Sequence, residues 1–203
     1  MSMILVQLAG GAHERILRLT EPFHDKYCTD RVIIYDCVYP RNVDYWSRYP
    51  AILEWMRYYY KVGLLEPIVY LDADTLIVGN ENLADALPPD CDCGGVLNRW
   101  NQVNTGALWF RATQAAMQLV TNIIDKGPVL KESRDAGGFD QARFNVELPK
   151  SGVRFWPVDS RWNSYKFAAK SPCQSIQVVA WHGLSLTKAE QEIQRLTALL
   201  SAH

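Results

Sequence analysis

The chain has 203 residues, 48% of them apolar, which is enough to build one sizeable hydrophobic core. Its 21 basic and 22 acidic residues give a formal net charge of −1, so the cationic surplus that holds a nucleic acid backbone is missing. The sequence shows neither a cleavable signal pattern nor a run of eighteen apolar residues. We therefore expect one compact domain over residues 1–203, without a transmembrane segment and located in the cytoplasm.

The five cysteines favour reduced thiols in a cytosolic protein, because their number is odd and their spacing is scattered. They are Cys28, Cys37, Cys91, Cys93 and Cys173. The pair at 91 and 93 is separated by only one residue and follows two prolines, which favours an ordinary loop over a metal site.

In chain order, short apolar runs at 4–8 and 31–35 predict two buried parallel strands. Between them the segment 14–27 has partly helical spacing, which Pro22 interrupts. Pro50 suits the first turn of a helix that runs to about residue 65 and leads into a third strand at 68–71.

The second half continues the alternation of strands and helices. A strand is predicted at 102–110, and Thr113 caps a helix that ends at Gly127. After a strand at 175–180, Thr187 and Glu190 form the capping box of a last helix. This alternation predicts an α/β fold with a mostly parallel central sheet and helices on both faces, which places ligands beyond the carboxyl ends of its strands.

Two acids follow the predicted strand at 68–71 directly. Asp72 and Asp74 are two residues apart, and side chains two apart on a strand share one face. Two uncompensated carboxylates that close repel each other, so the arrangement favours a bound cation, and Mg²⁺ or Mn²⁺ suits oxygen ligands of this kind. The alternative is a solvated turn whose acids accept backbone hydrogen bonds.

Two families carry such a motif. The run Asp72, Asp74 and Thr75 resembles the nucleophile motif of haloacid-dehalogenase-like phosphatases, which implies Asp72 as the nucleophile. In those phosphatases the motif usually follows the first strand and a later acidic pair completes the site. Here two strands precede the motif and such a pair does not follow, so this is the alternative hypothesis.

The stronger resemblance is to GT-A glycosyltransferases with a DxD motif, most nearly the glycogenin-like and lipopolysaccharide-galactosyltransferase-like family. It covers residues 3–184 and rests on four pieces in that family's order, namely YLDADTLIVGN, VNTGALWF, GGFDQARFN and Trp181-His182-Gly183. The chain departs from the family after Gly183, where the usual Lys-Pro-Trp is replaced by Leu184-Ser185-Leu186. The resemblance implies a Rossmann-like domain with its nucleotide-binding part at 1–110, its acceptor side and metal-site closure at 111–186, and a C-terminal helix at 187–201.

The same resemblance implies a metal-dependent enzyme that moves a hexose from a UDP-sugar to a hydroxyl of a glycan, a lipid-linked or a protein acceptor. The metal, Mn²⁺ or Mg²⁺, would be bound by Asp72, Asp74 and His182. A non-catalytic sugar-nucleotide-binding domain of a longer enzyme is a further alternative.

Further residues follow from the resemblance and from their chemistry. Candidate donor contacts are Leu8, Ala9, Gly10, Tyr35, Asp36, Arg57, Lys61, Asp72, Ala73, Asn104 and Gly183. Asp140 is the candidate catalytic residue, either accepting the proton of the acceptor hydroxyl or stabilising positive charge at the sugar carbon; its carboxylate could instead simply favour a helix dipole. Trp162 and Asn163 are acceptor-side candidates.

Overall fold

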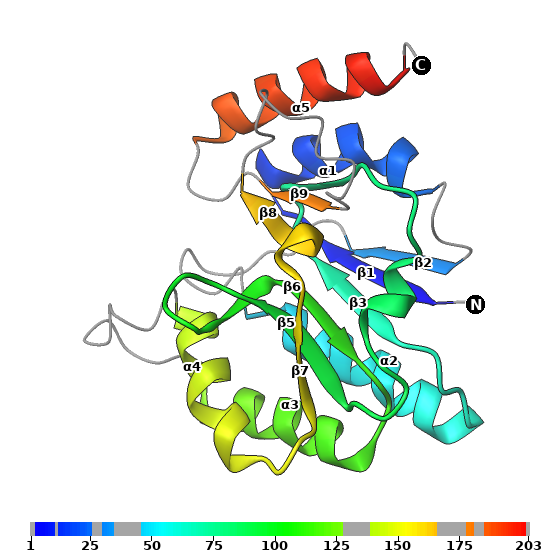
Figure 1. Cartoon of the computed structure of the whole chain (residues 1–203), viewed down its shortest axis with the longest axis vertical. Helices are drawn as coiled ribbons and strands as arrows, with labels where there is room; N and C mark the ends of the chain where they lie inside the picture. Colours follow the sequence, from blue (N-terminus) through cyan, green and yellow to red (C-terminus); the bar gives the residue numbers. More distant parts are fainter. Residues whose placement is uncertain are drawn as a thin grey trace.

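The computed structural model describes residues 3–10, 12–25, 30–34, 46–127, 139–165, 178–180 and 185–201. Within these ranges six strands form the main sheet, in the order β2-β1-β3-β6-β5-β7 (Figure 1). Their bounds are β1 Ile4–Leu8, β2 Asp30–Ile34, β3 Ile68–Leu71, β5 Cys93–Leu97, β6 Val103–Phe110 and β7 Phe155–Val158.

One strand of this sheet runs against the others. β1 is parallel to β2 and β3, and β5 is parallel to β7, whereas β6 is antiparallel to both of its neighbours, β3 and β5. The sheet is therefore mostly parallel, as the sequence predicts. Because β6 is reversed, it begins at the edge where β3 and β5 end, and this edge lies to the left in Figure 1.

Three helices cover one face of the sheet: α2 Arg48–Val62, α3 Gln114–Lys126 and α4 Phe139–Glu147, the last continued by a short 3-10 helix, η3 Leu148–Lys150. Apolar side chains of α2 at helical spacing, such as Ile52, Met56 and Tyr59, pack with Leu119 and Ile123 of α3 against the sheet. The helix ends have local causes, since Gly63 takes a left-handed conformation after α2 and the Thr113 side chain caps α3.

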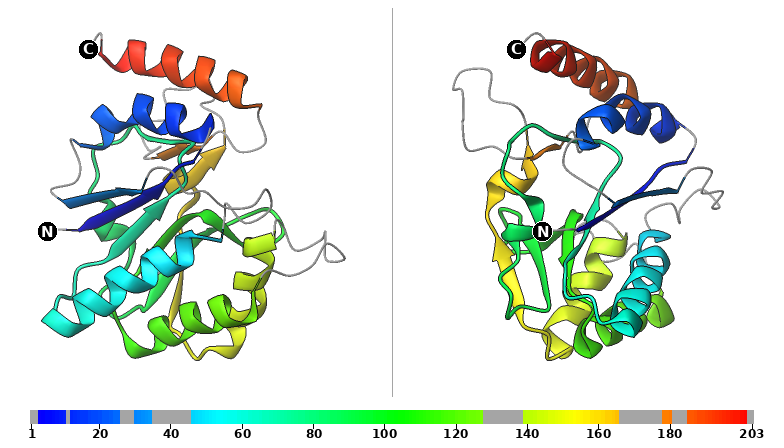
Figure 2. Two further views of the ribbon diagram at one scale, coloured as in Figure 1. Left: turned by 180° about the vertical axis from the view of Figure 1, so that it is seen from behind. Right: turned by 90° about the vertical axis from the view of Figure 1, so that its right-hand side faces the viewer.

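The other face is covered by two short 3-10 helices, η1 Leu83–Ala86 and η4 Ser160–Asn163, which contribute to a second apolar cluster with Trp109 of β6. Beyond it lies a small sheet of β4 Thr75–Ile77, β9 Val178–Ala180 and β8 Ser164–Tyr165. Helices α1 Ala12–His24 and α5 Leu186–Ser201 pack together over this small sheet through Ile16, Leu76, Val179 and Ile193 (Figures 1 and 2). Helices thus lie on both sides of the molecule's sheets.

Several local expectations are wrong. Helix α1 continues through Pro22 to His24, so the proline lies in the last turn and the helix ends two residues after it. The last helix begins at Leu186, and the Ser185 hydroxyl accepts a hydrogen bond from the Lys188 amide, so the cap lies two residues before Thr187. The pair at 91 and 93 does not lie wholly in a loop, because Cys93 is the first residue of β5, which pairs with β6 and β7.

Both thiols of the pair at 91 and 93 are free and buried, and burial raises the pKa of each, which agrees with inert packed thiols. In the part of the chain that the structure describes, helices are too short or too polar to cross a bilayer.

Strand β5 fits between its neighbours because it carries Gly94 and Gly95. A Cβ added at Gly95 would lie 2.6 Å from a methyl group of Val103 and 3.3 Å from one of Leu108. We therefore expect Gly95→Ala to destabilise the fold by about 1–3 kcal/mol through overpacking. Chemical denaturation measures this, and an unchanged free energy of unfolding would show that β5 and β6 adapt without strain.

Candidate active site

Several predicted site residues meet at the carboxyl edge of the sheet. β1 ends at Leu8 and β3 ends at Leu71, and since Val6 pairs with Tyr70, the segments that follow the two strands leave the sheet side by side. Ala9, Ala73 and Leu17 of α1 form a small buried cluster. The Leu8-Ala9-Gly10 segment is thus packed against the segment that carries the two acids.

Asp72 and Asp74 lie in a turn and not on a strand, which corrects the geometric argument made from their spacing. The Asp72 carbonyl accepts hydrogen bonds from the Thr75 amide at 3.2 Å and the Thr75 hydroxyl at 2.7 Å. The turn is needed because the chain leaves the main sheet here, and Thr75 begins β4, which pairs with β9. The side chains of Asp72 and Asp74 are both partly exposed.

Arg48, at the start of α2, supplies a cation that the sequence did not reveal. Its side chain is only 3% exposed, and its guanidinium lies 3.1 Å from Oδ1 of Asp72 and 3.6 Å from Oδ2 of Asp140. It also donates a hydrogen bond to the Thr105 carbonyl. Burial alone would lower the pKa of Arg48, but the surrounding negative charge, first that of Asp72, holds it above its ordinary value. The arginine is therefore a permanent cation between two acids.

Asp140 lies in the first turn of α4, as predicted, and faces Arg48. Its Oδ2 accepts a 2.8 Å hydrogen bond from the Thr105 hydroxyl. Burial raises the pKa of Asp140, and this outweighs the opposing effects of Arg48 and Thr105. A carboxylate of this kind is a stronger proton acceptor than an exposed aspartate, which suits general base catalysis.

Two tyrosines surround the charged groups. The Tyr70 hydroxyl donates to Oδ1 of Asp72 at 2.8 Å, and the Arg48 guanidinium lies 4.7 Å from the centre of the Tyr70 ring. The Tyr49 hydroxyl donates to the Asp140 carbonyl at 3.4 Å. Burial raises the pKa of both tyrosines, so both remain neutral hydrogen bond donors.

Asn104 lies at the start of β6, beside the Asp72 turn. The Asp72 amide donates to the Gly106 carbonyl at 2.8 Å, and the Asn104 side chain accepts a 2.8 Å hydrogen bond from the Gly106 amide. Asn104, Thr105 and Gly106 therefore connect the Asp72 turn with Asp140.

Arg57 and Lys61 do not join the cluster. At 1.5 Å per helical residue, Arg57 lies about 13 Å along α2 from Arg48, and Lys61 lies further still. Arg57 instead lines a hollow of about 430 Å³ between α2 and α3 with Glu54 and Asp125.

Trp162 and Asn163 are buried, with 3% and 2% of their surface exposed. The Trp162 ring packs edge-on against Trp109, with ring centres 6.3 Å apart, so this tryptophan belongs to the core. A stacking role in acceptor binding does not fit this burial.

Four predicted site residues lie outside the described residues: Tyr35, Asp36, His182 and Gly183. β9 ends at Ala180, which pairs with Thr75 next to Asp74. Among the residues that the structure does describe, groups of three or more potential metal ligands were not found. The expected set of Asp72, Asp74 and His182 therefore stays a prediction.

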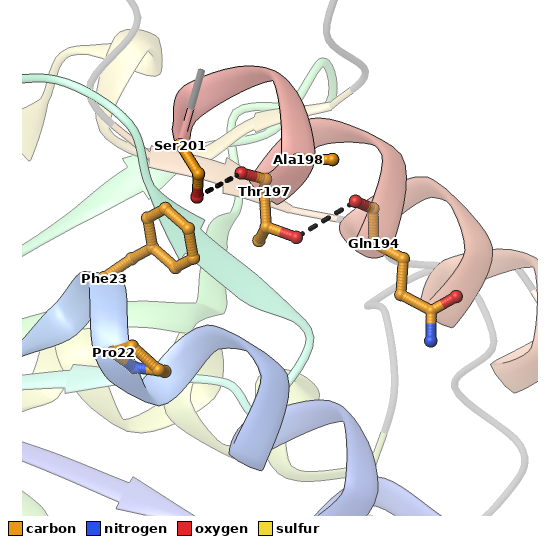
Figure 3. Close-up of a pocket in the computed structure, with 6 residues that line it drawn as sticks. All are labelled: Pro22, Phe23, Gln194, Thr197, Ala198 and Ser201. Atoms are coloured by element: carbon orange, nitrogen blue, oxygen red, sulfur yellow. Dashed lines mark hydrogen bonds between the residues drawn. The ribbon is translucent and has the colours of Figure 1, made fainter. Parts of the chain in front are cut away.

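A second hollow of about 430 Å³ lies between α1 and α5 and is lined by Pro22, Phe23, Gln194, Thr197, Ala198 and Ser201 (Figure 3). The Thr197 and Ser201 hydroxyls donate to carbonyls of their own helix, at 3.0 and 2.9 Å. Its six lining residues carry no charge, so it offers little to hold a diphosphate. The charged cluster of Arg48, Asp72 and Asp140, which we call the acid-arginine cluster, is the better candidate.

Comparison with known proteins supports the fold. Neither a protein-family model nor a curated protein matches the sequence. Among solved structures, the chain is similar to a glycosyltransferase involved in the glycosylation of the major capsid of PBCV-1, with a TM-score of 0.72 and 12% sequence identity. The match covers 96% of this chain and all of the other. The chain therefore has the mixed α/β fold of a glycosyltransferase domain.

Replacing Arg48 with Met should destabilise the protein by about 3–5 kcal/mol, because buried acids lose their cation. The loss should be larger near pH 8 than near pH 5. Without Arg48 the pKa of Asp140 rises further above its unfolded value, and stability from such a raised carboxyl pKa is present at low pH and lost as the pH rises through the folded pKa.

Melting temperatures at the two pH values measure this effect. The matched control is Arg195→Met, since Arg195 pairs with Glu192 but both side chains are about half exposed, at 51% and 48%, and its loss should cost little at either pH. Equal losses for both variants would contradict a central role of Arg48.

Proposed function

We propose that the protein transfers a hexose from a nucleoside diphosphate sugar, specifically a UDP-sugar, to a hydroxyl acceptor. The observation that carries the proposal is the acid-arginine cluster at the carboxyl edge of a glycosyltransferase-like sheet. This edge is where open α/β sheets bind nucleotides. The ordered sequence motifs support it, because Asp72, Asp140 and the carbonyl of Thr105, which follows Asn104, all contact the Arg48 cation.

The nucleotide would lie along β1 and β2. Leu8, Ala9 and Gly10 follow β1 and pack against Ala73, so their backbone borders the space beyond the sheet. Tyr35 and Asp36 follow β2 in the sequence and would flank the base. The diphosphate would then reach the Asp72 turn, where a divalent cation held by the turn would offset its charge.

The two carboxylates of this turn fit a hard divalent cation, because such ions prefer oxygen ligands. Arg48 already neutralises Asp72 in part, so we assign the main ligand role to Asp74, with Asp72 and His182 beside it. When bound, Mn²⁺ or Mg²⁺ would neutralise charge on the departing diphosphate.

Asp140 would act on the sugar or on the acceptor. Arg48 and Thr105 fix its carboxylate in one orientation, and its raised pKa makes it a good proton acceptor. Accepting the hydroxyl proton would give inversion, whereas stabilising positive charge at the sugar carbon would suit retention. The anomeric configuration of the product distinguishes the two.

The phosphatase alternative requires Asp72 as a nucleophile. Its Oδ1 accepts a hydrogen bond from Tyr70 and pairs with Arg48, and both interactions reduce the nucleophilicity of a carboxylate. The geometry therefore supports glycosyl transfer better.

If the site binds donor and metal together, UDP should raise the melting temperature much more with Mn²⁺ than with a chelator, because ligands that bind only the folded state stabilise it. Thermal shifts in the two buffers measure this. Equal shifts would remove the metal from the proposal, and the absence of any UDP effect would remove the donor.

Asp74→Asn keeps the size of the side chain and removes its charge. Each ~1.4 kcal/mol of lost transition-state stabilisation costs tenfold, so consumption of UDP-sugars should fall at least roughly 100-fold. The melting temperature should stay near that of the wild type, because Arg48 still holds Asp72.

The control is Asp125→Asn, an exposed carboxylate near the end of α3 that should leave the rate unchanged. A less stable Asp74→Asn protein with a wild-type rate would show that Asp74 only supports the turn.

A further inference from the structure

The turn between β5 and β6 displays an exposed tryptophan at the same edge as the acids. Trp100 is 64% exposed, whereas Trp109, further along β6, is fully buried. Since Leu71 pairs with Ala107 and the Asp72 amide bonds the Gly106 carbonyl, the start of β6 lies beside the Asp72 turn. Trp100 therefore stands only four residues before Asn104, on the rim of the candidate site.

The turn that carries Trp100 is held in one conformation. The Asn98 side-chain oxygen accepts hydrogen bonds from the amides of Trp100 at 2.9 Å and Gln102 at 3.0 Å, and the Asn98 amide donates to the Gln102 carbonyl at 2.8 Å. Asn101 takes a left-handed conformation with φ of 59°, which asparagine tolerates better than most residues. A group displayed on such a turn loses little conformational entropy when it binds a ligand.

Arg99 accompanies the tryptophan. Its guanidinium carbon lies 4.1 Å from the centre of the Trp100 ring, a cation-π contact that orients the indole. Arg99 is itself exposed. Arg99 and Trp100 together form a flat aromatic surface with adjacent hydrogen bond donors, which we call the Trp100 platform.

Helix α4 ties this platform to the candidate catalytic residue. The Asn145 side chain accepts from the Val103 amide at 2.7 Å and donates to the Val103 carbonyl at 2.9 Å. Asp140 lies at the start of the same helix, and the turn between β5 and β6 lies beside that end in two opposite views (Figures 1 and 2). The platform and Asp140 thus have a fixed relation to each other.

The order of the strands suggests what the platform contacts. Along the edge, β1 borders the expected nucleotide, β3 carries the acids, and β6 and β5 carry the platform. The Asp72 amide bonds the Gly106 carbonyl and Trp100 lies six residues before Gly106, so the platform lies further out along β6 as well as across the sheet, within about 20 Å of the acids, which leaves space for a sugar ring between them. We propose that the Trp100 platform is the acceptor subsite and binds an uncharged sugar ring of a glycan by stacking it on the indole.

This inference rests on the proposed function, but binding tests it without catalysis. The sequence contains seven tryptophans, so the indole N–H signals of ¹⁵N-labelled protein can be assigned individually, that of Trp100 by its loss in Trp100→Phe. Titration with methyl β-glucoside, methyl β-galactoside, cellobiose and lactose should shift the Trp100 signal in a saturable way for at least one of them.

Trp100→Ala should weaken the binding of that saccharide about 10-fold or more, as expected for the loss of an aromatic stacking partner. The control Trp156→Ala should bind it as the wild type does, because Trp156 is 43% exposed but lies on β7 beside Gly94, at the end of β5 that is opposite the Trp100 turn. Wild-type affinity in Trp100→Ala, or a Trp100 signal that none of the four saccharides shifts, would overturn the proposal.

Two further measurements separate this proposal from others. Sedimentation of the wild type and Trp100→Ala would reveal a dimer that depends on Trp100, and that result would overturn the acceptor role in favour of a contact between copies of the chain. The effect of UDP with Mn²⁺ on the wild type tests the donor proposal independently. If the protein binds a saccharide but not UDP, both the donor assignment and the role of the platform as an acceptor site are overturned. If it binds UDP but no saccharide shifts the Trp100 signal, the platform proposal alone is overturned.

Discussion

A guanidinium that is only 3% exposed needs negative charge beside it, because taking a cation out of water costs several kcal/mol. Arg48 meets this need with Asp72 and Asp140, and its hydrogen bond to the Thr105 carbonyl adds a third partner. These partners come from the end of β3, the start of α4 and the start of β6. The positions of α2 and α4 at the edge of the sheet are thus coupled through one side chain.

The same interactions act on the charge state of Asp140. Its burial raises its pKa, which by itself would favour the neutral acid, while Arg48 and the Thr105 hydroxyl favour the carboxylate. A carboxylate held between opposing influences of this kind is poised for proton transfer, and perturbed groups in such surroundings are common at functional sites. The balance depends on four segments that are far apart in the sequence.

Much of the fold could be predicted from local patterns. The apolar runs gave β1 and β3 their bounds, and Thr113 and Gly127 marked the ends of α3. β5 and β7 were missed because two glycines interrupt the first and Pro157 the second, and both owe their pairing to partners distant in sequence. Asp72, Asn104 and Asp140 were found through motif order. Arg48 was missed because a cation at a helix start looks like a surface residue, and only its tertiary partners reveal its burial.

The reversed strand β6 and the turn before it differ in their exposure to solvent. The strand is buried along its whole length and joins β3 to β5, while the turn before it, with Arg99 and Trp100, is exposed at the edge that carries the acids. Ala107 and Leu108 pair with β3 seven or more residues beyond Trp100, so we expect changes in that turn to leave this pairing intact. Surface loops tolerate such changes far better than buried ladders do. Under the proposed function, remodelling this one hairpin tip would alter acceptor preference without disturbing the residues assigned to the donor.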